Sequence, residues 1–129
     1  MDKLEFLRAV LADEGFYCVV GLDKKKEEGG KGRNQVQVFF EDIESAIEKA
    51  EELSENGYNA YYALGTFKDS EVEKPRGQHN VAYLKSIFLD IDYGPVHGRP
   101  SDYETAREAL EALKNFCGAT GLPKPMLVN

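Results

Sequence analysis

Two aspartates stand one residue apart at the end of an apolar run. Asp90 and Asp92 lie within SIFLDIDYGP, which spans residues 86–95. In a β-strand side chains alternate between faces, so both carboxylates would share a face, with their α-carbons about 6 to 7 Å apart. Carboxylates this close repel each other unless one is protonated or a cation lies between them. Because Mg²⁺ and similar cations prefer oxygen ligands, the pattern indicates a Mg²⁺ or Mn²⁺ site suited to phosphoryl or nucleotidyl transfer.

The same residues have a purely structural explanation. An apolar strand followed by Asp-x-Asp and Gly-Pro is also an ordinary way to leave a sheet, with Asp90 or Asp92 capping the turn around Gly94 and Pro95. The motif is short, and many unrelated sequences contain it. Spacing alone therefore leaves metal ligation and turn capping both open.

Three helices are predicted from apolar residues at helical spacing. The first covers residues 2–13, and the second runs from Asp42, a plausible N-cap, to Gly57. The third begins after a capping box of Ser101 with Glu104 and ends near Gly121.

Strands are predicted between these helices. They cover residues 16–22, 35–40, 59–67 and 83–92, and the final PMLVN resembles the start of another; residues 23–34 and 68–82 are predicted loops. Interleaved helices and strands favour an α+β fold, here a mixed sheet of about five strands with about three packed helices. The length of 129 residues fits a single domain over 1–129.

Composition narrows the function classes. The chain is 42% hydrophobic and 30% charged, which is typical of a soluble globular protein. Its two cysteines form no CxxC pair, and no apolar stretch approaches the roughly 20 residues that span a bilayer, so we expect a cytoplasmic protein without a membrane partner. The net charge of −7 argues against nucleic-acid binding by the whole surface, but a local basic patch remains compatible with it.

The second half of the chain resembles a known family. NAYYALGTF, the polar loop with Arg76, HNVAYLKSIFLDIDYG, a helix and GLPKPMLVN together resemble the amino-terminal part of archaeo-eukaryotic-type primases, in particular phage and plasmid primase-polymerases that are often joined to a helicase. The resemblance covers about residues 58–129. It implies that Asp90 and Asp92 are catalytic and ligate the metal ions of a DNA primase. It also implies a DNA template, nucleoside triphosphates and a helicase domain or subunit as partners, in the host cytoplasm if the protein is viral.

The chain departs from that family pattern at its end. PKPMLVN resembles the strand that leads into a Ser-Gly-x-Gly-x-His stretch, whose His contacts the incoming nucleotide, but the sequence stops at Asn129. A further acidic metal ligand is also absent. The resemblance therefore implies a primase domain truncated before its later motifs, with an incomplete catalytic site and weak or no activity alone.

Basic residues supply secondary candidates for nucleotide or DNA binding. Arg76, His79 and Lys85 precede or lie within the segment that carries the acids, although a loop and an exposed strand position explain them as well. The segment from residue 24 to residue 33 holds five basic and two acidic residues, and it could contact a phosphate backbone or form a solvated hairpin loop. Its candidate residues are Lys24, Lys25, Lys26, Lys31 and Arg33.

Two functions from other classes stay open. A haloacid-dehalogenase-type phosphatase also uses a strand ending in Asp-x-Asp, with a nucleophile and a general acid, but its motif normally lies near the chain start and continues with Thr or Val where Gly94 stands. The other is a non-enzymatic α+β module, such as a replication accessory or interaction protein, in which the aspartates merely turn the chain.

Overall fold

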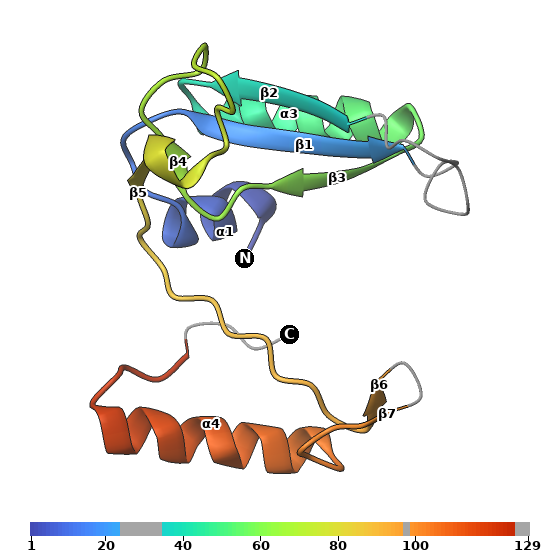
Figure 1. The fold of residues 1–129 in the computed structure, drawn as a ribbon, viewed down its shortest axis with the longest axis vertical. Coiled ribbons are helices and arrows are strands. Elements are labelled where there is room, and N and C mark those ends of the chain that lie inside the picture. The colour runs from blue at the N-terminus through green and yellow to red at the C-terminus, as the bar shows by residue number, and fades with distance from the viewer. Residues whose placement is uncertain (24–34, 97–98, 126–129) are drawn as a thin grey trace. The chain divides into compact units, whose positions relative to one another are not determined.

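The structure is a computed structural model that describes residues 1–23, 35–96 and 99–125, and it divides into two compact units (Figure 1). Unit 1 spans Met1–Ile87, and unit 2 spans residues 88–129. Each unit has secondary structure of its own. The expectation of one domain over the whole chain stays a prediction.

An antiparallel sheet of three strands forms the centre of unit 1. Its order is β2-β1-β3, with β1 at Tyr17–Asp23, β2 at Gln35–Phe40 and β3 at Tyr58–Tyr62. Because β1 is the central strand, its first five residues are all buried. Its β-branched and aromatic side chains suit a strand that is covered on both sides.

Strand register assigns the side chains of the sheet to its two faces. Val20 lies opposite Tyr61 of β3 and opposite Gln37 of β2, so these three side chains share one face. Val19, which lies opposite Tyr62, belongs to the other face and is fully buried. The two neighbouring tyrosines of β3 therefore point in opposite directions.

Helix α3, Ile43–Glu55, packs on the Val19 face of the sheet (Figure 1). It begins where the sequence predicts, since the Asp42 side chain accepts a hydrogen bond of 2.7 Å from the backbone N–H of Ser45. It ends before Gly57, whose φ of +86° is a left-handed conformation that glycine adopts most easily. A Cβ on Gly21 would lie 3.2 Å from both methyl groups of Leu53, so this glycine lets the helix pack closely.

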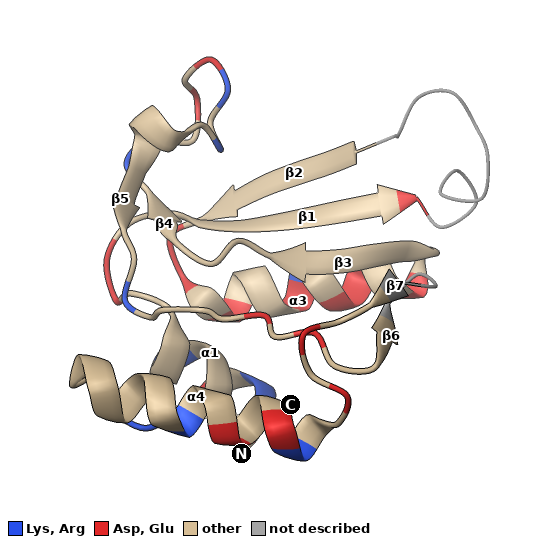
Figure 2. Ribbon diagram, turned by 60° about the horizontal axis from the view of Figure 1, so that its bottom comes forward, with Lys and Arg blue, Asp and Glu red and all other residues tan. Residues whose placement is uncertain are grey.

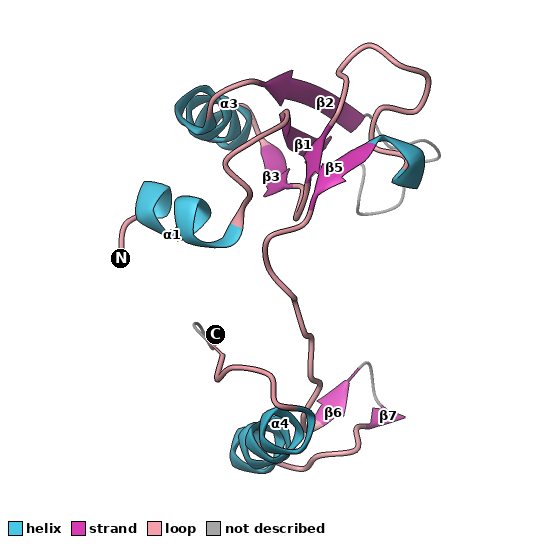
Figure 3. Cartoon of the chain, turned by 90° about the vertical axis from the view of Figure 1, so that its left-hand side faces the viewer, coloured by secondary structure: helices cyan, strands magenta, loops and turns pink. Residues whose placement is uncertain are grey.

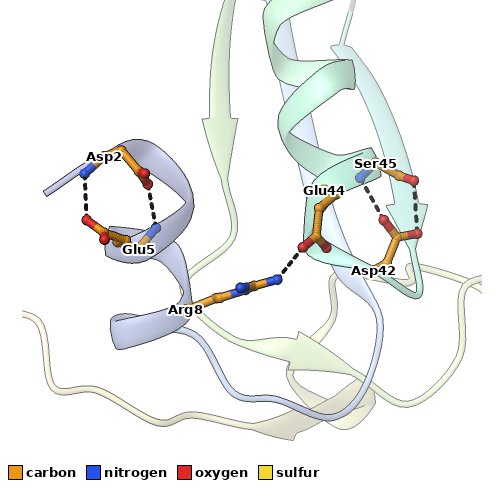
Figure 4. Close-up of polar contacts among 6 residues, drawn as sticks. All are labelled: Asp2, Glu5, Arg8, Asp42, Glu44 and Ser45. Atoms are coloured by element: carbon orange, nitrogen blue, oxygen red, sulfur yellow. Dashed lines mark hydrogen bonds and ion pairs between the residues drawn. The ribbon is translucent and has the colours of Figure 1, made fainter.

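Helix α1, Lys3–Val10, packs beside α3 through Leu7 and Val10. Its capping box is reciprocal: Asp2 accepts from the Glu5 N–H at 2.8 Å, and Glu5 accepts from the Asp2 N–H at 3.0 Å. Figure 4 shows this box together with the ion pair between Arg8 and Glu44 that joins the two helices.

The opposite face of the sheet is partly covered by a two-stranded sheet. β4, Thr66–Phe67, pairs with β5, Val81–Tyr83, and the short 3-10 helix η1, Gln78–Asn80, precedes β5. Figure 3 shows α3 and β5 on opposite sides of the central sheet. Cys18, Val20 and Phe67 form the buried cluster on this side, and the Phe39 and Phe67 rings meet edge to face at 5.6 Å.

Unit 2 consists of a two-stranded sheet and one long helix. β6, Pro95–Val96, pairs with β7, Arg99–Pro100, and α4 runs over Ala106–Thr120. The helix ends at Gly121 with φ +75°, as predicted. Figure 2 shows Asp and Glu along α4 and also along α3 of unit 1. The acidic residues of α3 are exposed, as expected for the solvent-facing side of a helix.

The predicted start of α4 is wrong by one turn. The capping box is formed by Thr105 with Glu108. Ser101 is not the N-cap, because its hydroxyl donates to the Tyr103 carbonyl at 2.7 Å. Both pairs match the same Ser/Thr-x-x-Glu pattern, so the pattern alone could not distinguish them.

The α+β class and three α-helices are confirmed for the part of the chain that the structure describes. One sheet of about five strands is not confirmed, because the described strands form sheets of three, two and two strands, all antiparallel. The predicted strand over residues 59–67 is divided into β3 and β4. The predicted loop over 68–82 contains η1 and the start of β5. Of the predicted terminal strand, residues 126–129 lie outside the described residues.

Candidate functional site

The predicted strand over residues 83–92 is wrong beyond Tyr83. β5 ends at Tyr83, and residues 84–94 have no regular secondary structure. A strand forms only when its backbone pairs with a neighbour, and no described residue pairs with this segment. Because residues 84–92 form no strand here, the alternation of side chains that would put Asp90 and Asp92 on one face does not apply. Their joint site stays a prediction.

Both aspartates are exposed in unit 2, directly before a bend at Gly94. Gly94 adopts φ +67°, and its N–H donates to the Tyr103 carbonyl at 2.7 Å. Neither Asp90 nor Asp92 accepts a hydrogen bond from a residue that the structure describes. The turn is thus held by backbone contacts, and the capping role that was the structural explanation for the aspartates is not observed.

The segment before the aspartates carries several exposed apolar side chains. Leu84, Ile87 and Leu89 are 63%, 71% and 56% exposed. Single exposed apolar residues are common, but a run of them in one segment indicates a surface that another element normally covers. The sequence is therefore suited to a buried strand, although it has no pairing partner among the described residues.

The donor set at the aspartates fits a hard cation only in part. Two carboxylates supply the oxygen ligands that Mg²⁺ and Mn²⁺ prefer. Within residues 1–23, 35–96 and 99–125, no group of three or more His, Cys, Asp or Glu side chains is gathered to hold a metal ion. Asp90 and Asp92 would have to be completed by further oxygen ligands, such as the phosphates of a substrate.

Lys85 and His79 have structural surroundings of their own. Lys85 donates from Nζ to the Arg8 carbonyl at 2.8 Å and lies 3.6 Å from the Asp13 carboxylate, so it ties the segment after β5 to the end of α1. His79 is exposed in η1, and its backbone carbonyl accepts from Lys68 Nζ at 3.2 Å. Their predicted binding roles stay a prediction. The loop candidates Lys24, Lys25, Lys26, Lys31 and Arg33 lie outside the described residues.

Arg76 is the basic candidate that lines a hollow. The hollow, about 460 Å³, lies within unit 1 on the face of the central sheet that α3 does not cover. Arg76 from the loop before η1 lines it together with Tyr61 of β3, Leu64 and Gln35 of β2. A volume of roughly 300 to 1,000 Å³ is typical of small-ligand pockets. Arg76 is a predicted binding residue, but its grouping with the other three could not be predicted from the sequence, because they come from separate strands and loops.

The three tyrosines of the β3 region have different environments. Tyr58 and Tyr62 pack against the cluster beneath α3, and burial raises the pKa of Tyr62. Tyr61 is 49% exposed on the opposite face. Alternation along the strand predicts that Tyr61 and Tyr62 point to opposite faces of the sheet. It does not predict which of the two faces is exposed, because that depends on where α3 packs.

Burial and charge act in opposite directions on the thiol beneath this face. Burial raises the pKa of Cys18 and outweighs the positive charge of Arg76, which lowers it, so that this pKa lies at about 11. The positive charge of the Arg76 guanidinium therefore acts on the buried residues of this face of the sheet.

Comparison of the chain with protein-family models, curated proteins and solved structures finds no match. In the described part of the chain, no helix has both the length and the apolar character needed to cross a membrane.

Proposed function

We propose that residues 1–129 form the amino-terminal part of a DNA primase-polymerase, with Asp90 and Asp92 as its metal-ligating catalytic acids. The observation that carries the proposal is that both carboxylates stay free of the turn that follows them. Their chemistry therefore remains available for a cation. The resemblance of IFLDID to the first catalytic motif of archaeo-eukaryotic-type primases supplies the reaction class.

The exposed apolar run before the aspartates supports the same proposal. In the complete catalytic domain, residues 84–92 would be a strand of the larger sheet, paired with strands that follow in the chain. Burial of Leu84, Ile87 and Leu89 would then be favourable by roughly 25 cal/mol per Å² of apolar surface removed from water. Pairing would also restore the period-two alternation that puts both carboxylates on one face.

The aspartates supply negative charge and geometry rather than protons. When bound, Mg²⁺ or Mn²⁺ would lower the pKa of a primer or initiating 3′-hydroxyl and hold the triphosphate of the incoming nucleotide. A DNA template and nucleoside triphosphates are the substrates, and a helicase domain or subunit is the proposed partner. Because two carboxylates alone are an incomplete ligand set, residues 1–129 are expected to be weakly active or inactive without the later motifs.

Metal titration of residues 1–129 is the first test. We expect Mn²⁺ binding, measured by electron paramagnetic resonance of the free ion, to be lost in Asp90→Asn combined with Asp92→Asn. The matched control is Asp102→Asn combined with Glu104→Gln, two exposed acids of the same unit, and it should bind Mn²⁺ like the parent. Equal binding by parent and the Asp90/Asp92 variant would instead favour the non-enzymatic replication module.

Primer synthesis is the second test. A longer protein that adds the downstream motifs should incorporate nucleotides on a DNA template, and Asp90→Ala in that protein should abolish incorporation. Synthesis at the parental rate by the Asp90→Ala protein would reject the primase assignment.

A further inference from the structure

The hollow beside Arg76 combines an exposed aromatic ring with a cation on the open half of the central sheet. Leu22 and Val20 of β1 form part of its lining, with Tyr61 and Gln35 from the strands on either side. Register explains this grouping, because Val20 pairs with Tyr61 and Leu22 pairs with Gln35. Residues from three strands are thereby placed on one surface.

β4 and β5 cover only one end of this face. Phe67 packs over Cys18 and Val20, which closes that end as a buried cluster. Tyr61, which lies opposite Val20, and Leu64, which follows β3, nevertheless remain 49% and 51% exposed. The face therefore offers solvent an aromatic ring and an aliphatic side chain beside its buried half.

The loop that carries Arg76 is firmly braced. Asn80 is 4% exposed, and its side-chain NH₂ donates to the carbonyls of Asp69 and Pro75 at 2.6 and 2.7 Å. Its side-chain oxygen accepts from the Asp69 N–H at 3.2 Å. Within this loop Lys74 adopts φ +54°, a conformation that costs a non-glycine residue free energy. A loop held this way presents Arg76 at low entropic cost on binding.

The charge at the hollow is positive although the whole chain is acidic. Its lining contains one charged side chain, Arg76, and no Asp or Glu among the described residues. Arg76 forms no ion pair with a described residue, whereas Lys3, Arg8, Lys49 and Lys85 all have acidic partners. An anionic group at this point would meet a guanidinium that is not already neutralised.

We propose that this hollow binds an unpaired base of a single-stranded nucleic acid, with the base stacked on Tyr61 and its phosphate contacting Arg76. A ring beside a guanidinium is the combination that recognises a base with its phosphate, and Gln35 adds a hydrogen-bonding amide at the rim. A paired duplex is a poorer fit, because its bases are already stacked on each other. The choice of a nucleic acid rests on the proposed primase function, for which this surface would hold the template strand.

The test is binding of a short fluorescein-labelled oligothymidylate to residues 1–129 at low salt, followed by fluorescence anisotropy. We expect weak binding, with a Kd on the order of 10 to 100 µM. Tyr61→Ala should raise the Kd roughly tenfold, because stacking of one base is lost. Arg76→Ala should raise it by a similar factor and reduce the salt dependence by about 0.7 in the slope of log K against log salt.

Three kinds of variant separate binding from general damage. Tyr61→Phe keeps the ring and should bind within about twofold of the parent. Leu64→Lys adds a cation to the rim and should lower the Kd, an effect that misfolding cannot imitate. Tyr93→Ala and Arg107→Ala, an exposed tyrosine and an exposed arginine of unit 2, should leave the Kd unchanged.

Several outcomes would overturn the inference. The first is that the parent does not bind the oligonucleotide, and the second is that Tyr61→Ala and Arg76→Ala both bind it like the parent. The third is that the two substitutions weaken binding of thymidine triphosphate but not of the oligonucleotide, which would assign the hollow to a free nucleotide. Asp90→Asn combined with Asp92→Asn should bind the oligonucleotide like the parent. Loss of metal binding with retained oligonucleotide binding, or the reverse, therefore distinguishes failure of one proposal from failure of the other.

Discussion

At the scale of single residues, two glycines have similar positive φ angles but differ in the space around them. Gly15 has φ +92° and Gly57 has φ +86°. A Cβ on Gly15 would lie 2.7 Å from Thr66 Oγ1 and 3.0 Å from the Phe67 carbonyl oxygen, whereas a Cβ on Gly57 would meet nothing within 4 Å. Thr66 cannot move aside easily, because it is fully buried and its hydroxyl donates to the Glu14 carbonyl at 2.6 Å.

This difference predicts a ranking of two substitutions. Gly57→Ala should lower the free energy of unfolding by about 1 kcal/mol, because only the left-handed backbone is strained. Gly15→Ala should lower it by about 3 kcal/mol, because strain and overlap with Thr66 add together. Urea unfolding followed by circular dichroism measures both. Equal losses would show that the contact with Thr66 relaxes at no cost.

At the scale of elements, the N-terminus of α3 should make stability depend on acid. The backbone and side-chain hydrogen bonds from Ser45 hold the pKa of Asp42 below its ordinary value of 3.8. A carboxyl whose pKa is lower in the folded state stabilises the protein above its unfolded pKa. That contribution is lost as the pH falls through the folded value. The stabilisation by Asp42 should therefore be present above about pH 4 and be lost progressively as the pH falls from there through the folded pKa.

Asp42→Asn isolates this effect, because asparagine can also cap a helix but does not titrate. Between pH 5 and pH 2.5, roughly the range over which a carboxyl of this kind titrates, the parent should lose more stability than the variant. Glu48→Gln, which removes an exposed carboxylate from the same helix, should follow the parent. Parallel pH profiles for the parent and Asp42→Asn would contradict the assignment of the cap.

At the scale of the whole molecule, the apolar core is concentrated in unit 1. Both clusters of buried hydrophobic residues lie within Met1–Ile87. In the described part of unit 2, the hydrophobic residues that reach the same degree of burial are Ala109 and Cys117. Folding free energy follows buried apolar area, so the two units should differ in their ability to fold in isolation.

We expect residues 1–87 alone to unfold cooperatively, with a free energy of unfolding of about 5 kcal/mol. Residues 88–129 alone should show partial helicity and a broad, non-cooperative thermal transition, because one helix and a short hairpin bury too little surface. Thermal and urea unfolding by circular dichroism distinguish these cases. Absence of a cooperative transition in residues 1–87 would show that its stability depends on the second unit.

Local signals allowed the bounds of α3 to be predicted closely, whereas α1 ends at Val10, before the predicted end at residue 13. Asp42 and Gly57 limit α3 because capping and the left-handed C-terminal residue involve groups within a few positions of one another. The start of α4 was missed because Ser101–Glu104 and Thr105–Glu108 carry the same capping pattern. Ser101 instead bonds to the carbonyls of Gly94 and Tyr103, and Thr105 is the residue that caps the helix.

The sequence by itself determined that three helices form, the buried character of β1, the alternating pattern of β2, and the candidate acids Asp90 and Asp92, since each depends on neighbours along the chain. Only the tertiary structure decided which strands pair, that residues 84–92 have no described partner, and that Tyr61 and Arg76 line one hollow. The physical reason is that strand pairing and burial join residues far apart in the chain. Their outcome depends on which surfaces meet, and no local pattern encodes that.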